Sequence, residues 1–389
     1  MAMPVVRNKK QGATGVNSVF DEVYGLLGEP GNDLVMRAIR DGMAPVGYTC
    51  SYVPEALLSA GQLFPVRMRA PGAAGTEAAD IYLSSVTCSY VRSLLEYAMD
   101  GRYDFLRGWA FAASCDHLRR LYDNLGRLVR PGFIHILDVP HKRGAAAVAW
   151  FAEELRIFAA ALGGHFGTDT GPGAVAESIR DLNAFNARLR AIGELRKLDV
   201  PRLTGGEFHA LMLAAGASPK KLFAGILDDL ERALRGRAPA KKFRARVVIA
   251  GGQLDDPAYI NAIEDQGALV VADRLCTGSV PALAPVPEGG DPFAALAAHY
   301  LSRTSCPRMM EDHDARVRDI IALAREYRAD GVIVQTVKFC DCWGVEITPL
   351  ARALRDAGLP VLRLEREYHM GAEGQLRTRV QAFIESMGK

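Results

Sequence analysis

Residues 244–273, RARVVIAGGQLDDPAYINAIEDQGALVVAD, indicate the fold class of this chain. The stretch opens with a dense apolar run at 244–252 and closes with another at 268–273, both rich in valine and alanine. Between them, 257–266 has the pattern of a helix. A strand, a helix and a second strand in this order predict a βαβ unit, in which the two strands lie parallel and are buried on both faces.

The alternation continues toward the C-terminus. GVIVQTV at 331–337 predicts a third strand, and the segments ITPLARALRDAG at 347–358 and LPVLRLE at 359–365 follow it. The C-terminal part is therefore expected to form a small doubly wound domain, with helices on both faces of a parallel sheet.

The N-terminal half shows a similar alternation. Strands are expected at 45–50, 63–70, 109–112 and 133–137, and helices at 54–61, 90–99, 116–129 and 145–162. From about 171 to 240, apolar residues recur at three- and four-residue steps, which predicts helices throughout. We expect an α/β protein with two Rossmann-like (flavodoxin-like) parallel-sheet domains and a helical segment between them. The expected divisions are an N-terminal helical extension (1–43), a first α/β domain (44–165), a helical domain or linker (166–243) and a second α/β domain (244–389).

Composition restricts the function classes. The 389 residues include 47 basic and 45 acidic side chains, a net charge of +2, without the clustered basic excess of a nucleic-acid-binding surface. No window of 18 apolar residues occurs, so no membrane span is expected, and residues 1–12 lack the apolar core of a secretory signal. We expect a cytoplasmic protein without nucleic-acid or membrane partners, whose cysteines are not paired in structural disulfides.

The seven cysteines carry the most chemical information. They are Cys50, Cys88, Cys115, Cys276, Cys306, Cys340 and Cys342. Four of them, Cys50, Cys115, Cys276 and Cys340, end or closely follow predicted strands. In open α/β sheets ligands bind beyond the carboxyl ends of the strands, so these four are expected on the side where a site forms. Cys88 opens a predicted helix, where backbone N–H groups and the helix dipole favour a thiolate.

Three other roles compete with cofactor binding. Single cysteines are most often small buried apolar side chains, but several of these adjoin polar residues such as Asp116, Thr277 and Asp341. Structural zinc prefers local CxxC or HxxxH pairs, and neither occurs in the sequence. Catalytic cysteine chemistry needs one thiol and a nearby base, not six thiols. Thiolate ligation of an iron–sulfur cluster, assembled from distant loops, is the favoured interpretation.

Several segments carry a resemblance to a known family. They are GYTCSYVPEALLSAGQLFPVRM (47–68), TCSYVRSLLE (87–96), ASCDHLRRLYDNL (113–125), ADGVIVQTVKFCDCWGVE (329–346), LEREY (364–368) and GQLRTRVQAFIE (374–385). These segments resemble the 2-hydroxyacyl-CoA dehydratase and benzoyl-CoA reductase family, including its double-cubane-cluster reductases. The resemblance spans nearly the whole chain beyond about residue 44.

The resemblance implies an iron–sulfur cofactor. Cys88, Cys115 and Cys340 match the three cysteines with which family members hold a cubane. The additional cysteines of the double-cubane branch are matched by Cys50, Cys276 and Cys306. Six ligands favour an [8Fe-9S] double cubane, with a single [4Fe-4S] cluster as the alternative. Cys342 is interpreted as a neighbour of the cluster and not as a ligand.

The resemblance also implies an enzyme and its partners. We expect the iron–sulfur subunit of an ATP-dependent, low-potential benzoyl-CoA reductase, an oxidoreductase that acts on CH–CH bonds in anaerobic aromatic degradation. Electrons come from a separate ATP-hydrolysing iron–sulfur activator, and the chain itself has no GxxxxGK[ST] loop. The expected partners are this activator, a homologous larger subunit or a second copy of the chain, and a CoA thioester substrate. The alternatives are a stand-alone homodimeric double-cubane reductase of small molecules, a 2-hydroxyacyl-CoA dehydratase subunit, and a non-catalytic electron-transfer subunit.

Three side chains are candidate catalytic proton donors. His117 follows Cys115, Glu55 lies in the first expected helix, and Glu346 follows the last cysteine loop. Each has a structural interpretation as well, because acidic side chains in the first turn stabilise a helix and a histidine on a helix often lies at the surface.

Overall fold

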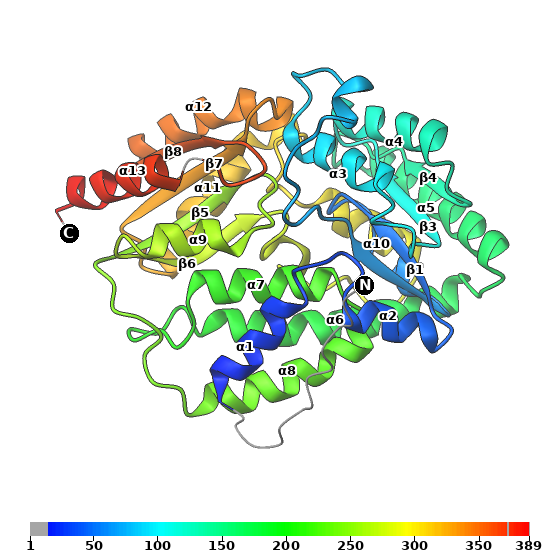
Figure 1. Cartoon of the computed structure of the whole chain (residues 1–389), viewed down its shortest axis with the longest axis horizontal. Coiled ribbons are helices and arrows are strands. Elements are labelled where there is room, and N and C mark those ends of the chain that lie inside the picture. The colour runs from blue at the N-terminus through cyan, green and yellow to red at the C-terminus, as the bar shows by residue number, and fades with distance from the viewer. Residues whose placement is uncertain (1–14, 372, 389) are drawn as a thin grey trace, which may run out of the picture.

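The computed structural model describes residues 15–371 and 373–388. The sequence interpretation of residues 1–12 and the beginning of the expected N-terminal extension lie outside these residues. The chain forms two four-stranded parallel sheets (Figure 1). The first sheet contains, in spatial order, β2 (Leu63–Arg67), β1 (Ala44–Tyr48), β3 (Gly108–Ala112) and β4 (Ile134–Leu137). The second sheet contains, in spatial order, β6 (Ala268–Leu275), β5 (Ala245–Gly251), β7 (Gly331–Val337) and β8 (Val361–Arg366). Each sheet therefore has the flavodoxin-like order 2-1-3-4, which confirms the expected fold class.

Thirteen α-helices occur in the described part of the chain, with short 3₁₀ turns between some of them. The helices are α1 (Val16–Gly25), α2 (Asp33–Arg40), α3 (Ser89–Met99), α4 (Asp116–Leu128), α5 (Ala145–Phe166), α6 (Pro172–Glu194), α7 (Gly205–Gly216), α8 (Lys220–Arg235), α9 (Pro257–Glu264), α10 (Pro292–Leu301), α11 (His313–Glu326), α12 (Asp341–Asp356) and α13 (Glu373–Ser386).

The strands of the second sheet are continuous apolar runs because helices cover both faces. All residues of β5 and β7 are buried. Successive side chains of a strand point to opposite faces. Val247 and Ile249 accordingly pack with the core formed by α9 and α13. Val248 and Ala250 pack on the other face with α11 and α12.

The first sheet is also covered on both faces. Val46 shares a core with Phe151 of α5 and Phe293 of α10, while Phe111 packs with Leu94 of α3 on the opposite face. Helix α10 follows β6 in the sequence, so part of the C-terminal half packs on the first sheet. The expected domain boundaries stay a prediction.

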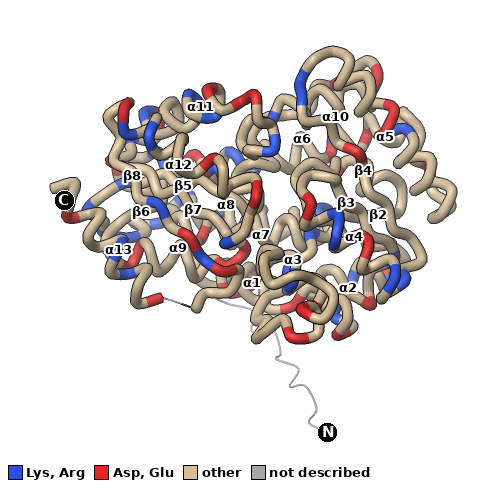
Figure 2. The backbone as a smooth tube through the Cα atoms, turned by 90° about the horizontal axis from the view of Figure 1, so that it is seen from above, with Lys and Arg blue, Asp and Glu red and all other residues tan. Residues whose placement is uncertain are grey.

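Helices α1, α6, α7 and α8 form a separate apolar core that lies below the two sheets in Figure 1. No helix of the described residues is long and apolar enough to cross a membrane. Seen from above, basic and acidic positions are interspersed along the backbone (Figure 2).

The helix expected at 54–61 is wrong, because this segment contains only the 3₁₀ turn η1 (Leu57–Ser59). Ala56, Leu57 and Leu58 are consecutive and fully buried, so the segment has no solvent-facing side on which an amphipathic helix would depend. Gly61, at φ +62°, then turns the chain into β2 before another helical turn can form.

Candidate cofactor site

The carboxyl ends of strands from both sheets lead into one cavity. Its lining includes all seven cysteines, which are spread along the sequence from Cys50 to Cys342. The cavity leaves about 130 Å³ for the centres of water-sized molecules. All seven cysteines are free thiols. The structure thus brings together the six cysteines expected to hold a cluster, and places Cys342 beside them.

Three of the cysteines are the N-cap residues of helices. Cys88 precedes α3, Cys115 precedes α4 and Cys340 precedes α12. A backbone N–H group in the first turn of each helix and the positive end of each helix dipole favour negative charge on these three sulfur atoms. These are the cysteines that the family resemblance marks as the ligands of a cubane.

The other cavity cysteines come from loops. Cys50 lies two residues after β1, Cys276 directly follows β6, and Cys306 lies between α10 and α11. Phe339, immediately before Cys340, has φ +64°, a conformation that a bulky side chain rarely adopts. Strained backbone of this kind often occurs at functional sites, and here it turns the chain from β7 into α12.

Burial keeps most of the cavity thiols protonated. It raises the pKa of Cys88 to about 11 and the pKa of both Cys276 and Cys340 to about 12, and raises the pKa of Cys115 as well. Cys306 differs, because a hydrogen bond from the Cys342 thiol lowers its pKa to about 7. Metal binding requires thiolates, so loading this cavity with metal would release protons.

Three donors beside the cysteines are left without partners. Thr49 Oγ1, Arg67 Nε and Gln253 Nε2 are buried and make no hydrogen bond within the described residues. All three residues line the cysteine cavity. Buried polar groups are rarely left unsatisfied, and a negatively charged, sulfur-rich group in the cavity would accept hydrogen bonds from them. The residues present therefore fit an iron–sulfur cluster.

A single metal ion fits this cavity less well. In the parts of the chain that the structure describes, no group of three or more histidine, cysteine, aspartate or glutamate side chains could hold one metal ion. A lone zinc ion draws its thiolates to about 2.3 Å from itself. A cluster spreads them over several irons. A cavity with many separate cysteines therefore favours the cluster.

The three expected proton donors do not line the cysteine cavity. His117 contacts residues next to the cavity. Its Nδ1 accepts a hydrogen bond from the Cys88 backbone N–H at 3.3 Å, and its Nε2 lies 3.5 Å from the Asp341 carboxylate. It therefore contacts the starts of α3 and α12, the helices that Cys88 and Cys340 cap.

Glu55 and Glu346 are buried members of ion pairs. Lys220 Nζ lies 2.8 Å from Glu55, and Tyr48 donates its hydroxyl hydrogen to Glu55 at 2.6 Å. Burial opposes ionisation of Glu55, but Lys220 and Tyr48 outweigh it and hold its pKa below the usual range. Glu346 accepts a hydrogen bond from Arg316 at 2.9 Å and lies at the same distance from His313.

Sequence reasoning missed Arg67, Thr49 and Gln253 as cavity residues. Arg67 carried a signal, because it is a charged residue at the carboxyl end of an otherwise apolar strand and is only 5% exposed. Gln253 offered none, since it lies in a glycine-containing turn whose pattern indicates only a tight connection.

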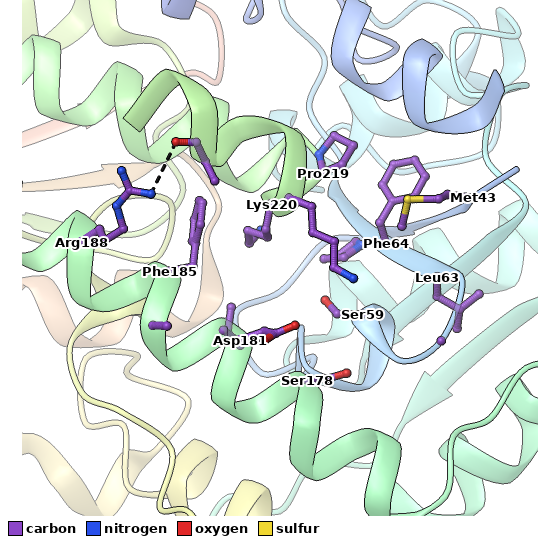
Figure 3. A pocket seen from close by; sticks show the side chains of 16 residues that line it. Met43, Ser59, Leu63, Phe64, Ser178, Asp181, Phe185, Arg188, Pro219 and Lys220 are labelled. Atoms are coloured by element: carbon purple, nitrogen blue, oxygen red, sulfur yellow. Dashed lines mark hydrogen bonds between the residues drawn. The ribbon is translucent and has the colours of Figure 1, made fainter. Parts of the chain in front are cut away.

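A larger pocket lies beside the edge strand β2, against α6 and α8 (Figure 3). It leaves about 450 Å³ for the centres of water-sized molecules and is lined by apolar side chains such as Phe64 and Phe185, with Lys220 among the polar ones. A cavity of about 20 Å³ shares Phe185 and Lys220 with this pocket and shares Arg67 with the cysteine cavity. The small cavity therefore borders side chains of both larger spaces.

The fold and the cavity define a class of protein, in which two doubly wound sheets gather cysteines from distant loops around one internal space. The chain belongs to the family described as 2-hydroxyglutaryl-CoA dehydratase, D-component, which matches residues 50–387. The family named by the sequence resemblance is thereby confirmed.

Curated members of this family are similar to the chain over most of its length. The provisionally named dehydratase subunit YjiM of Escherichia coli K12 is 26% identical, covering 96% of this chain and 99% of its own. The beta subunit of (R)-2-hydroxyglutaryl-CoA dehydratase from Acidaminococcus fermentans is also 26% identical, and the match covers 96% of this chain and 100% of that subunit. The C subunit of benzoyl-CoA reductase from Thauera aromatica is 24% identical, and the match covers 88% of this chain and 90% of that subunit.

Proposed function

We propose that this chain is the iron–sulfur subunit of an ATP-dependent, low-potential reductase of the benzoyl-CoA reductase type. The observation that carries the proposal is the cavity lined by all seven cysteines. The sequence resemblance implies that six of them are the ligands of a double cubane. The similarity to one of the subunits of the Thauera aromatica benzoyl-CoA reductase supports the enzyme class. The relatives are named as subunits of larger enzymes, which supports a partner subunit for this chain. In this proposal a separate ATP-hydrolysing protein supplies the electrons.

Cys88, Cys115 and Cys340 would hold the first cubane, and Cys50, Cys276 and Cys306 the second half of an [8Fe-9S] double cubane. The bound cofactor supplies low-potential electrons for reduction of an aromatic acyl-CoA. The protein's own contribution is to exclude water: Tyr90 and Trp343 line the cavity and are 6% and 4% exposed. A dry site prevents loss of electrons to protons of the solvent.

The test is anaerobic purification of the chain, alone and with the neighbouring gene products, followed by iron and sulfide analysis. About eight irons per chain supports the double cubane, and about four a single [4Fe-4S] cluster. Binding of benzoyl-CoA to the chain or its heteromer, and its reduction with the activator and ATP, supports the reductase. Protein that is folded but contains neither iron nor sulfide contradicts the proposal.

A dehydratase subunit is the second candidate. It is favoured by the similarity to the beta subunit of the Acidaminococcus fermentans (R)-2-hydroxyglutaryl-CoA dehydratase. The same preparation distinguishes the two. If the preparation removes water from a 2-hydroxyacyl-CoA and leaves benzoyl-CoA unchanged, the chain belongs to a dehydratase. A chain that reduces small molecules as a homodimer, or one that only passes electrons to a partner, would represent the remaining alternatives.

A further inference from the structure

Arg67 is held at the cysteine cavity by hydrogen bonds to both halves of the chain. It ends β2 and is only 5% exposed. Its Nη1 donates to the Ser51 hydroxyl at 2.9 Å and to the Cys276 carbonyl at 2.7 Å, and its Nη2 donates to the Thr49 carbonyl at 3.4 Å. These contacts link the segments that carry Cys50 and Cys276, and they fix the plane of the guanidinium.

The charge of Arg67 has no direct counter-charge among its hydrogen-bond partners. All three partners are neutral oxygen atoms, and the carboxylate of Glu55 is engaged by Lys220 at 2.8 Å. The Nε–H is buried and makes no hydrogen bond within the described residues. A buried cation that lacks a counter-charge is costly for the folded protein. The arrangement therefore points to an anion that belongs in the cavity.

Two other buried arginines have carboxylate partners, whereas Arg308 donates only to neutral groups such as the Val139 and Pro140 carbonyls and lies outside the cysteine cavity. Arg69, two residues further along, is 3% exposed and lies 3.5 Å from the Asp255 carboxylate. Arg316 pairs with Glu346 at 2.9 Å. Unlike Arg67, neither arginine lines the cysteine cavity. Arg67 thus combines a cavity position with an unsatisfied donor and an unpaired charge.

We propose that Arg67 binds the inorganic sulfide or thiolate sulfur of the cavity's cofactor through its Nε–H and stabilises the reduced state of that cofactor. This inference rests on the proposed function, since it requires an iron–sulfur group. Each one-electron reduction adds one negative charge to the group. A fixed positive charge and a hydrogen bond to sulfur stabilise that charge, so they raise the reduction potential.

The test compares Arg67→Lys and Arg67→Gln with Arg69→Lys in anaerobically purified protein. Iron and sulfide content, circular dichroism and a redox titration followed by electron paramagnetic resonance are measured for each. We expect Arg67→Lys to keep its iron and to show a more negative midpoint potential, because an ammonium cannot reproduce the fork of the guanidinium. Arg67→Gln should shift the potential further, or lose iron while the fold is kept. Arg69→Lys should titrate like the wild type.

Arg67 variants that contain iron and sulfide and keep the wild-type midpoint potential overturn the inference. An equal shift of the midpoint potential in Arg69→Lys overturns it as well. If Arg67→Gln does not fold, Arg67→Lys decides the question alone. A wild-type chain without iron and sulfide overturns the proposed function itself, which is a separate and recognisable result.

Discussion

The imidazole Nδ1 of His117 accepts a hydrogen bond from the backbone N–H of Cys88 at 3.3 Å. This bond requires that the ring proton be on Nε2, which lies 3.5 Å from the Asp341 carboxylate. His117 follows Cys115 by two residues, and Asp341 directly follows Cys340. One side chain therefore connects the three helix starts that carry the expected cubane ligands, which makes His117 a positioning residue by its contacts.

Replacement of His117 tests this role. His117→Ala leaves the Cys88 N–H buried without a partner, which should destabilise the protein by about 1–3 kcal/mol. His117→Asn should recover part of the loss, because its side-chain oxygen can take the place of Nδ1. Thermal unfolding and the rate of iron release to a chelator measure both effects. Equal behaviour of the alanine and asparagine variants would argue against the hydrogen bond.

Serine substitutions separate ligands from neighbours among the cavity cysteines. Cys88→Ser, Cys115→Ser and Cys340→Ser should each lose most of the bound iron, because a serine hydroxyl is a poor substitute for a thiolate toward iron. Cys342→Ser should keep the wild-type iron content, although its thiol lies in the same cavity. Iron analysis of folded, anaerobically purified variants measures this. Loss of iron from Cys342→Ser would make this residue a ligand.

Much of this architecture follows from the sequence because apolar periodicity reports burial directly. The runs 245–251 and 331–337 are buried on both faces, so their strand character needs no tertiary information. The position of cysteines after strands was equally informative, since parallel strands present their carboxyl ends on one side of a sheet. That rule places Cys115 and Cys340 correctly at the cavity.

What the sequence did not indicate depends on contacts between distant segments. The segment 54–61 has helix-forming residues, but burial on all sides leaves only a 3₁₀ turn. Arg67 and Gln253 line the cavity through partners more than a hundred positions away, such as the Cys276 carbonyl for Arg67 and the Arg366 guanidinium for Gln253. No local pattern encodes such a pairing.

The ion pair between Lys220 and Glu55 should contribute strongly to stability. Lys220→Met leaves the Glu55 carboxylate buried and unpaired, which should cost about 3–5 kcal/mol. The double variant Glu55→Gln/Lys220→Met should recover a large part, because no buried charge then remains. The neighbouring Lys221→Met is the control, since Lys221 is exposed and its loss should change stability by less than about 0.5 kcal/mol. Urea unfolding measures all three, and equal midpoints for the two single variants would refute this role.

Glu264 should make the stability of the chain depend on pH. Its carboxylate accepts hydrogen bonds from the backbone N–H groups of Gly205 at 2.8 Å and Val270 at 3.0 Å, but burial outweighs these bonds and raises its pKa to about 7. Between an ordinary glutamate pKa and pH 7, the folded chain therefore binds more protons at Glu264 than the unfolded chain does. Stability from this group is complete at low pH and is lost as the pH rises toward and through 7.

The variant Glu264→Gln does not titrate in this range, so it isolates the effect. Its stability relative to the wild type should increase by about 3 kcal/mol between pH 4.5 and pH 8, whatever constant difference the amide introduces. Glu177→Gln, at an exposed position, should follow the wild type at every pH. Urea unfolding midpoints across this range measure the difference. Parallel curves for wild type and Glu264→Gln would mean that Glu264 is already ionised at pH 4.5, held so by the N–H groups at the start of α7.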